Sequence, residues 1–351
     1  MSSTHYAPNL NLLSLFCGAG GLDLGFRNAG FSVALAADFD QASVNTYNHN
    51  FKSSRSLLID LSRIYGVELV DLYRDITNAE LPIGILGGPP CQGFSQANSF
   101  SSPDDPRNKL PSRFVETLRA FNSAGRIHFF VFENVAGMKS QKHLGRYEEI
   151  RQEFEESGFK VFEQELNSRR YGVAQSRRRL FFVGLNRDIY EGKNFHFPCG
   201  EDTILTLRDT IYGLPDPTFY SRDLTPDQIS YHPNHWTMRP KSSKFGKPHL
   251  KFTGRSFKRL EWDKLSPTVA YGHREIHVHP TGIRRLSIFE AMLLQGFPEE
   301  YELVGNLSEQ VRQVSNAVPP PVAQCIASAL LELIMPSLEQ RNSKLQEVLD
   351  V

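Results

Sequence analysis

Short apolar runs alternate along the first half of the chain with segments that repeat apolar positions at helical spacing. The first run, residues 10–16, leads through a glycine-rich turn into a helical pattern over 22–29. Further apolar runs cover 32–37, 57–60, 83–86, 127–132, 161–166 and 179–185, and a helix is expected over 113–122. Continuous apolar runs are typical of strands that are buried on both faces. The alternation predicts an α/β domain with a mainly parallel sheet.

The pattern changes in the second half. Periodicity is lost from about residue 186 to about 265, where Pro, Gly, His and Lys are frequent. Order returns at Ser287, which together with Glu290 has the spacing of a capping box, and the helix that follows should stop at Gly296. A last helix carries four apolar residues on one face, namely Val322, Ile326, Leu330 and Leu333. We therefore expect a smaller, irregular second domain between the ordered parts.

Unusual residues follow three of the expected strands. A turn rich in glycine, including Gly18 and Gly21, follows the first strand, Cys91 follows the fourth, and Glu133 follows the fifth. Ligands of open parallel sheets bind at the carboxyl ends of the strands. The turn, the thiol and the carboxylate are therefore expected to converge at one edge of the sheet.

The glycine turn and the next two strands suggest an adenosyl ligand. A dinucleotide fingerprint requires a third glycine where this chain has Asp23, so that motif is incomplete. Asp38 ends the second strand, where a carboxylate accepts hydrogen bonds from ribose hydroxyls. Phe39 could cover an adenine ring, and Asp60 ends the third strand. These residues point to an adenosyl group without identifying the ligand.

Cys91 and Glu133 are the candidate reactive groups. Two glycines and two prolines precede Cys91, which makes a stiff turn that presents a side chain better than it fills a core. A cysteine thiol is partly ionised at neutral pH and is a good nucleophile. Glu133 follows five residues that include three phenylalanines, and burial would raise the pKa of its carboxyl group. The alternatives are a structural cysteine and a glutamate held in a salt bridge.

Composition narrows the class of protein. The chain has 351 residues, 40% hydrophobic and 22% charged, with a formal net charge of zero. Four scattered cysteines and no Cys-x-x-Cys pair argue against a disulfide framework, and no metal site is expected. The start lacks a signal-peptide pattern, and no run of 18 apolar residues occurs, so a cytoplasmic protein without a membrane span is expected.

Charge is unevenly distributed despite the neutral total. Residues 239–260 hold eight Lys and Arg and no acid, and residues 169–179 hold five arginines. One such run is typically a solubilising surface. Two runs beside the candidate reactive groups favour contacts with nucleic-acid phosphates.

Six motifs, in order and across nearly the whole chain, resemble those of the cytosine-C5 DNA methyltransferases. They are LFCGAGG at 15–21, GPPCQGFS at 88–95, ENV at 133–135, Gln-x-Arg-x-Arg at 175–179, RRL at 284–286 with QGFP at 295–298, and NAVPP at 316–320. The length suits a bacterial enzyme of a type II restriction–modification system. The resemblance implies a Rossmann-like fold that uses S-adenosylmethionine, with a smaller target-recognition domain.

The resemblance also implies a mechanism and its residues. The target cytosine is flipped out of the duplex. Cys91 adds to C6 of the base, Glu133 stabilises N3 and the amino group, and C5 takes the methyl group. Arg177 is expected to contact the base carbonyl, and Arg179 to support the pocket. Other expected substrate contacts are Gln92, Ser95, Asn134 and Gln175.

The resemblance assigns the cofactor contacts to eight residues, which are Phe16, Gly18, Ala19, Gly21, Asp38, Phe39, Asp60 and Asn316. Three positions depart from the family pattern. Ser14 stands where an acid is common, Ser315 where glycine is common, and Asp38 where glutamate is common. We expect these changes to tune cofactor affinity. Asp75 is an alternative to Asp60 for contact with the adenine amino group.

The final motif should return to the cofactor, so the domains should be discontinuous. We expect a catalytic domain over 1–185 and 300–351, and a recognition domain over 186–299, with double-stranded DNA between them. A monomer associated with the nucleoid is expected, and a cognate restriction endonuclease would share the DNA site without a stable complex. The alternatives are an RNA cytosine-C5 methyltransferase and a catalytically silent DNA-binding module.

Overall fold

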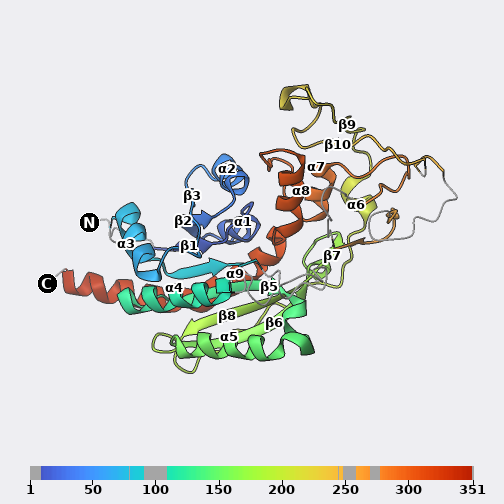
Figure 1. Cartoon of the computed structure of the whole chain (residues 1–351). Helices are drawn as coiled ribbons and strands as arrows, with labels where there is room; N and C mark the ends of the chain where they lie inside the picture. The colour runs from blue at the N-terminus through green and yellow to red at the C-terminus, as the bar shows by residue number, and fades with distance from the viewer. Residues whose placement is uncertain are drawn as a thin grey trace, which may run out of the picture.

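A seven-stranded sheet in the order β3-β2-β1-β4-β5-β8-β6 forms the centre of the molecule (Figure 1). This computed structural model describes residues 9–78, 80–90, 109–243, 245–247, 258–268 and 277–349, without the side chains of 341–349. The strands of the sheet are β1 Asn11–Leu15, β2 Ser32–Asp38, β3 Arg55–Leu58, β4 Gly84–Gly87, β5 Phe129–Val135, β6 Phe159–Asn167 and β8 Arg178–Asn186.

Most of the sheet is parallel, as the sequence predicts. The strands from β3 to β5 pair in parallel, whereas β8 runs antiparallel to both β5 and β6. The chain moves outward from β1 to β2 and β3 on one side and to β4 and β5 on the other. A ligand site is expected where the strand order reverses in this way, which is the carboxyl end of β1.

Helices cover both faces of the sheet, because alternate strand residues feed two separate apolar cores. Leu12 faces one core with α1, α2 and α9, and Leu13 faces the other with α3, α4 and α5. The α-helices are α1 Gly21–Asn28, α2 Gln41–Asn50, α3 Gly66–Thr77, α4 Leu110–Gly125, α5 Leu144–Glu156, α6 Leu207–Ile211, α7 Ile288–Leu294, α8 Leu307–Asn316 and α9 Pro320–Leu349. Short 3-10 helices lie at Ala136–Lys139, Gln141–His143, Ser168–Arg170 and Pro226–Gln228.

Two neighbouring strands end together at the edge expected to hold the site. In the β4–β5 register, Gly87 lies opposite Phe132. Gly88 and Glu133 therefore leave the paired region side by side. The sequence predicted that β5 would end before Glu133, but β5 continues to Val135 because β8 pairs with it as far as Arg179. Glu133 is consequently held by a strand and not by a loop.

The region after β8 is irregular, as predicted, and lies to one side of the sheet (Figure 1). Its described elements are α6 and two pairs of short parallel strands, β9 Thr218–Phe219 with β10 Trp236–Thr237, and β11 Ser266–Pro267 with β7 Gln175–Ser176. The β7–β11 pair ties this region to the segment that precedes β8. Much of the basic run 239–260 lies outside the described residues.

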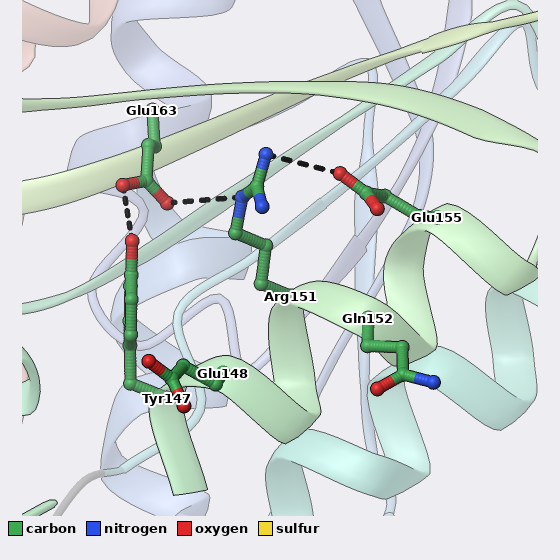
Figure 2. Close-up of a pocket in the computed structure, with 6 residues that line it drawn as sticks. All are labelled: Tyr147, Glu148, Arg151, Gln152, Glu155 and Glu163. Atoms are coloured by element: carbon green, nitrogen blue, oxygen red, sulfur yellow. Dashed lines mark hydrogen bonds and ion pairs between the residues drawn. The ribbon is translucent and has the colours of Figure 1, made fainter. Parts of the chain in front are cut away.

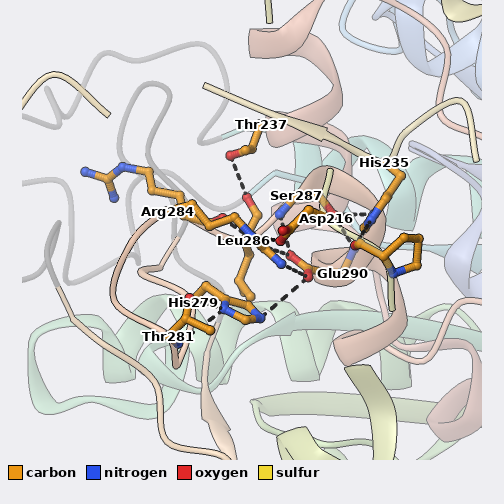
Figure 3. Close-up of polar contacts among 11 residues, drawn as sticks. Asp216, His235, Thr237, His279, Thr281, Arg284, Leu286, Ser287 and Glu290 are labelled. Carbon is orange, nitrogen blue, oxygen red and sulfur yellow. Dashed lines mark hydrogen bonds and ion pairs between the residues drawn. The ribbon is translucent and has the colours of Figure 1, made fainter. Parts of the chain in front are cut away.

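Helix α7 lies between the irregular region and the sheet (Figure 1). Ser287 caps it as predicted, and its Oγ accepts a hydrogen bond from the Glu290 amide at 3.0 Å. The buried Glu290 carboxylate receives both terminal nitrogens of Arg284, each at 2.9 Å (Figure 3). His235 and Thr237 of the irregular region bond to Ser287 Oγ and to the Leu286 carbonyl. The start of α7 is therefore the joint on which the irregular region is held.

The C-terminal helix α9 completes the core on the α1 face. The segment Leu307–Gln340 is long and apolar enough to span a membrane by length and composition, and 39% of its most apolar window is buried. Ala323, Ile326 and Leu330 pack in the core against α1. This packing buries part of the apolar surface of the helix.

Candidate cofactor and catalytic site

The glycine turn after β1 has an unusual backbone, because three of its residues are left-handed. Phe16, Gly18 and Gly20 have φ values of 55°, 53° and 78°. The Gly20 amide donates to the Cys17 carbonyl at 2.9 Å, and the Gly18 amide donates to Asp38 Oδ2 at 2.8 Å. Such a turn at a helix start turns backbone amides towards a ligand.

The last motif returns to this turn, as the sequence predicted. A Cβ added to Gly21 would lie 2.2 Å from the Val318 carbonyl oxygen, and one added to Gly25 would lie 2.5 Å from the Pro320 carbonyl oxygen. Only glycine allows approach this close. Asn316 lies just before this contact at the end of α8, with an exposed side chain.

Asp23 is a site residue that the sequence reasoning missed. Its carboxylate is fully buried beneath the turn and accepts a hydrogen bond from Ser14 Oγ at 2.7 Å. Burial raises the pKa of the Asp23 carboxyl to about 6, while the Ser14 bond opposes the shift. Ser14 stands where the family commonly has an acid. In this chain the carboxylate of Asp23, nine residues later, contacts Ser14. The signal was the unexplained acid where a third glycine would stand.

The expected adenosyl contacts lie at the ends of β2 and β3. Asp38 is buried, which raises the pKa of its carboxyl, and its two oxygens accept the amides of Gly18 and Asp40. Phe39 follows it with a side chain 63% exposed. Asp60 follows β3, and a bond from Ser62 lowers the pKa of its carboxyl. Asp75 lies in the last turn of α3, which leads to the opposite end of the sheet, so Asp60 is the better placed of the two.

Glu133 lies beside the exit of β4. A Cβ added to Gly88 would lie 3.2 Å from Glu133 Oε2, so the absence of a side chain at Gly88 leaves room for the carboxylate. Glu133 is buried, and burial raises the pKa of its carboxyl against the opposing charges of Arg179 and Arg177. The carboxyl can therefore hold a proton more readily than an exposed glutamate.

Cys91, Gln92 and Ser95 lie outside the described residues. The described segment before Cys91 stops at Pro90, two residues after Gly88. Within it, the Pro89 carbonyl accepts a hydrogen bond from the Asn134 side chain at 3.5 Å. The residues that lead to Cys91 are therefore fixed beside Glu133 and Asn134.

The two motif arginines have different surroundings. Arg179 Nε lies 3.1 Å from Glu133 Oε1. Arg177 is 2% exposed, and its guanidinium donates to the carbonyls of Ser315 at 2.8 Å and Asn316 at 3.2 Å. We predicted that Arg177 contacts the substrate and Arg179 supports it, whereas it is Arg179 that lies beside the candidate acid. Arg177 holds the end of α8, and Arg179 is paired with the candidate acid.

Gln175, an expected substrate contact, lies buried beside the end of α7. Its side chain is fully buried, and its amide donates to Gln295 Oε1 at 2.5 Å. Gln295 in turn donates to the Ala317 carbonyl at 2.6 Å. The motif glutamine therefore joins β7, α7 and the start of the last motif.

A hollow at the far edge of the sheet does not belong to this site. It lies between α5 and β6 (Figure 2) and is lined by Tyr147, Glu148, Arg151, Gln152, Glu155 and Glu163. The Glu163 carboxylate accepts the Tyr147 hydroxyl and pairs with Lys139 and Arg151. These charges satisfy one another. Among the described residues, no cluster of three or more His, Cys, Asp or Glu could hold a metal ion.

Comparison with known proteins matches the whole arrangement. A family model described as C-5 cytosine-specific DNA methylase matches residues 10–332. Type II methyltransferase M.FnuDI of Fusobacterium nucleatum is 33% identical, over 93% of this chain and 95% of that protein. M.MthTI of Methanothermobacter thermautotrophicus is 31% identical, over 92% and 97%. A solved prophage-encoded structure from E. coli, assigned as a DNA modification methyltransferase, is 26% identical with a TM-score of 0.72, over 93% and 99%.

The buried Asp23 carboxyl predicts a specific pH dependence of stability. Its folded pKa of about 6 exceeds the usual 3.8, so the folded state binds the proton more tightly than the unfolded state. The free energy of unfolding should therefore fall as pH rises from 4 to 6 and then level off. Asp23→Asn should remove this loss and be more stable at pH 8 by up to about 3 kcal/mol. Urea unfolding of both proteins between pH 4 and 8 tests this, and parallel pH curves would contradict it.

Proposed function

This chain belongs to the family of C-5 cytosine-specific DNA methylases, and from that premise we propose how its site carries out the reaction. The protein methylates cytosine at C5 in DNA, an activity of the restriction–modification type. The proposal concerns the cofactor, the roles of individual residues and the way DNA is held.

The glycine turn and the ends of β2 and β3 form the binding site for S-adenosylmethionine. The left-handed turn directs backbone amides, Asp38 offers a buried carboxylate for the ribose, and the exposed Phe39 ring is free to cover the adenine. Asp60 follows β3 near this surface, within reach of the adenine amino group. When bound, the cofactor supplies an electrophilic methyl group on a positively charged sulfur.

The reaction proceeds at the joint exit of β4 and β5. The Cys91 thiolate adds to C6 of an extruded cytosine, and a proton shared between Glu133 and N3 neutralises the charge that this addition creates. The electrons would reach C5, which would take the methyl group as its bond to the cofactor sulfur breaks and leaves that sulfur as a neutral thioether. Loss of the C5 proton to a base then expels the Cys91 thiolate and restores the ring. The observation that carries this proposal is the Glu133 carboxyl, which is buried against Gly88 at the start of the Cys91 segment.

Arg179 is the arginine that faces the base. Its ion pair with Glu133 supports this role, because it holds a cation beside the acid proposed to bind the base. Arg177 supports the site indirectly. It binds the carbonyls of Ser315 and Asn316, which precede the contact with the cofactor turn.

The recognition domain begins after β8, close to the expected residue 186. Its C-terminal boundary belongs near Ser287, earlier than the expected 299, because Gln295 and Phe297 pack against the catalytic part. Double-stranded DNA lies between the two parts, with the basic run 239–260 and the exposed Arg169, Arg170 and Arg178 near its phosphates. The protein acts as a cytoplasmic monomer at the nucleoid, with any cognate endonuclease sharing only the DNA site.

Bisulfite sequencing of DNA from cells that express the protein tests the function and identifies the methylated site. Protection of one cytosine in one short sequence is expected, and Cys91→Ala should abolish it while the thermal unfolding temperature changes little. No protected cytosine in DNA, together with methyl transfer to tRNA, would favour the RNA alternative. An Ala variant that fails to fold would mark Cys91 as structural.

Substitutions of Arg179 and Arg177 should have different effects, one on catalysis and the other on stability. Arg179→Lys should lower kcat for methyl transfer by about 100-fold with little change in stability, since lysine keeps the charge but lacks the planar, preorganised guanidinium at the reacting base. Arg177→Leu should instead destabilise the protein by about 3 kcal/mol, because it leaves buried carbonyls without donors. Single-turnover methyl transfer and urea unfolding measure the two effects. The reverse pattern would return the base contact to Arg177.

A further inference from the structure

Tyr301 reaches the cofactor turn from a distant part of the chain. Its hydroxyl is buried and donates a hydrogen bond to the Ala19 carbonyl. The Ala19–Gly20 peptide is therefore held on both sides, because its N–H already donates to the Cys17 carbonyl. Its orientation decides which way the neighbouring amides of the turn face.

The Tyr301 ring is fixed by aromatic neighbours. Phe297 lies 4.9 Å away and Phe51 lies 6.3 Å away between ring centroids. A Cβ added to Gly20 would lie 3.0 Å from the Tyr301 hydroxyl and 2.5 Å from the Phe51 ring. The hydroxyl is thus delivered to the turn by a rigid support.

The residues that follow Tyr301 are clamped to α2. The Asn50 side chain exchanges two hydrogen bonds with the Glu302 backbone, at 2.7 and 3.0 Å. Thr46 Oγ1 accepts the Val304 amide at 2.8 Å. Residues 301–304, which we call the brace, are therefore fixed along one side to the helix that follows β2.

The other side of the brace is held by the recognition region. Asn234 Oδ1 accepts the Leu303 amide at 2.8 Å, and Asn234 Nδ2 donates to the Leu303 carbonyl at 2.8 Å. The Asn234 carbonyl also accepts the Phe289 amide of α7 at 2.9 Å. Asn234 is 1% exposed, so these bonds are shielded from water. Leu303 lies two positions after the tyrosine that holds the cofactor turn.

We propose that Tyr301 is a positioning residue for the cofactor, and that the brace couples the cofactor turn to the recognition region through Asn234. The inference rests on the proposed cofactor site. A turn held by Tyr301 binds the adenosyl ligand without having to be ordered first. A change at Asn234 should alter the cofactor turn, because Asn234 holds the brace and Tyr301 of the brace holds the turn.

Calorimetric binding of S-adenosylhomocysteine to the full chain tests the first half without requiring catalysis or DNA. Tyr301→Phe should weaken binding about tenfold, the loss expected for one buried hydrogen bond that orders the site. Tyr73→Phe is the matched control, since Tyr73 is equally buried but packs in the other core, near Phe121. Equal affinity of wild type, Tyr73→Phe and Tyr301→Phe would overturn the inference alone. No binding by wild type would overturn the proposed cofactor site as well.

The proposed coupling between the recognition region and the cofactor turn is tested by substitutions at Asn234. Asn234→Ala should weaken S-adenosylhomocysteine binding about fivefold, and combining it with Tyr301→Phe should cost less than the sum of the two effects. Thr237→Val is its control, because Thr237 is a buried recognition-region residue that bonds to Leu286 and not to the brace. It should lower stability without changing affinity.

Thr46→Val keeps the test decisive if Asn234→Ala does not fold. It is nearly isosteric and removes only the Thr46 bond that clamps the brace to α2. A weaker affinity that is less than additive with Tyr301→Phe is expected. Lower thermal stability with an unchanged dissociation constant in both Asn234→Ala and Thr46→Val would show that the brace has no part in cofactor binding.

Discussion

The contact between the glycine turn and the last motif is the constraint on which the site depends. Gly21 lies so close to the Val318 carbonyl that a methyl group could not fit between them. Residues about 300 positions apart therefore form one wall, and the turn has its shape only when α9 is packed on α1. Arg177 strengthens this closure, because it binds the carbonyls just before Val318 and lies next to the strand that carries Arg179.

The second feature of the site is a set of buried carboxyl groups whose charge is not fully neutralised by their neighbours. Asp23, Asp38 and Glu133 are all buried, and in each case burial is the largest cause of a raised pKa. For Glu133 the raised pKa suits the proposed chemistry, since a carboxyl that holds a proton can donate to a ring nitrogen. For Asp38 the carboxylate has a structural task as well, because it accepts the Gly18 amide and so shapes the turn. Stability is lost at these positions in exchange for ordered polar groups.

The sequence predicted much of the fold because buried parallel strands have long apolar runs. It did not reveal α2, α3, α5 or α8. Apolar positions are few in α2, α5 and α8, and in α3 apolar residues also occupy the exposed face, as at Val67 and Ile76. It placed Glu133, Asp38 and the glycine turn at the correct edge, because strand ends are visible in the pattern. It could not show which of the two arginines is enclosed, since Arg177 lies between β7 and β8, Arg179 lies in β8, and the position of α8 decides that Arg177 is covered. Asp23 was missed because its contact with Ser14 appears only in the folded structure.

Four buried amide side chains act together as connectors. Gln175 and Gln295 join β7 to Ala317, while Asn234 and Gln310 join the recognition region to residues 303–305. Each of these side chains donates a hydrogen bond to a backbone carbonyl. An apolar side chain at such a position would fill the same space without fixing the direction of a carbonyl. Since methyl transfer requires the cofactor turn, the acid and the nucleophile in one register, amide side chains suit these joints because their bonds are directional.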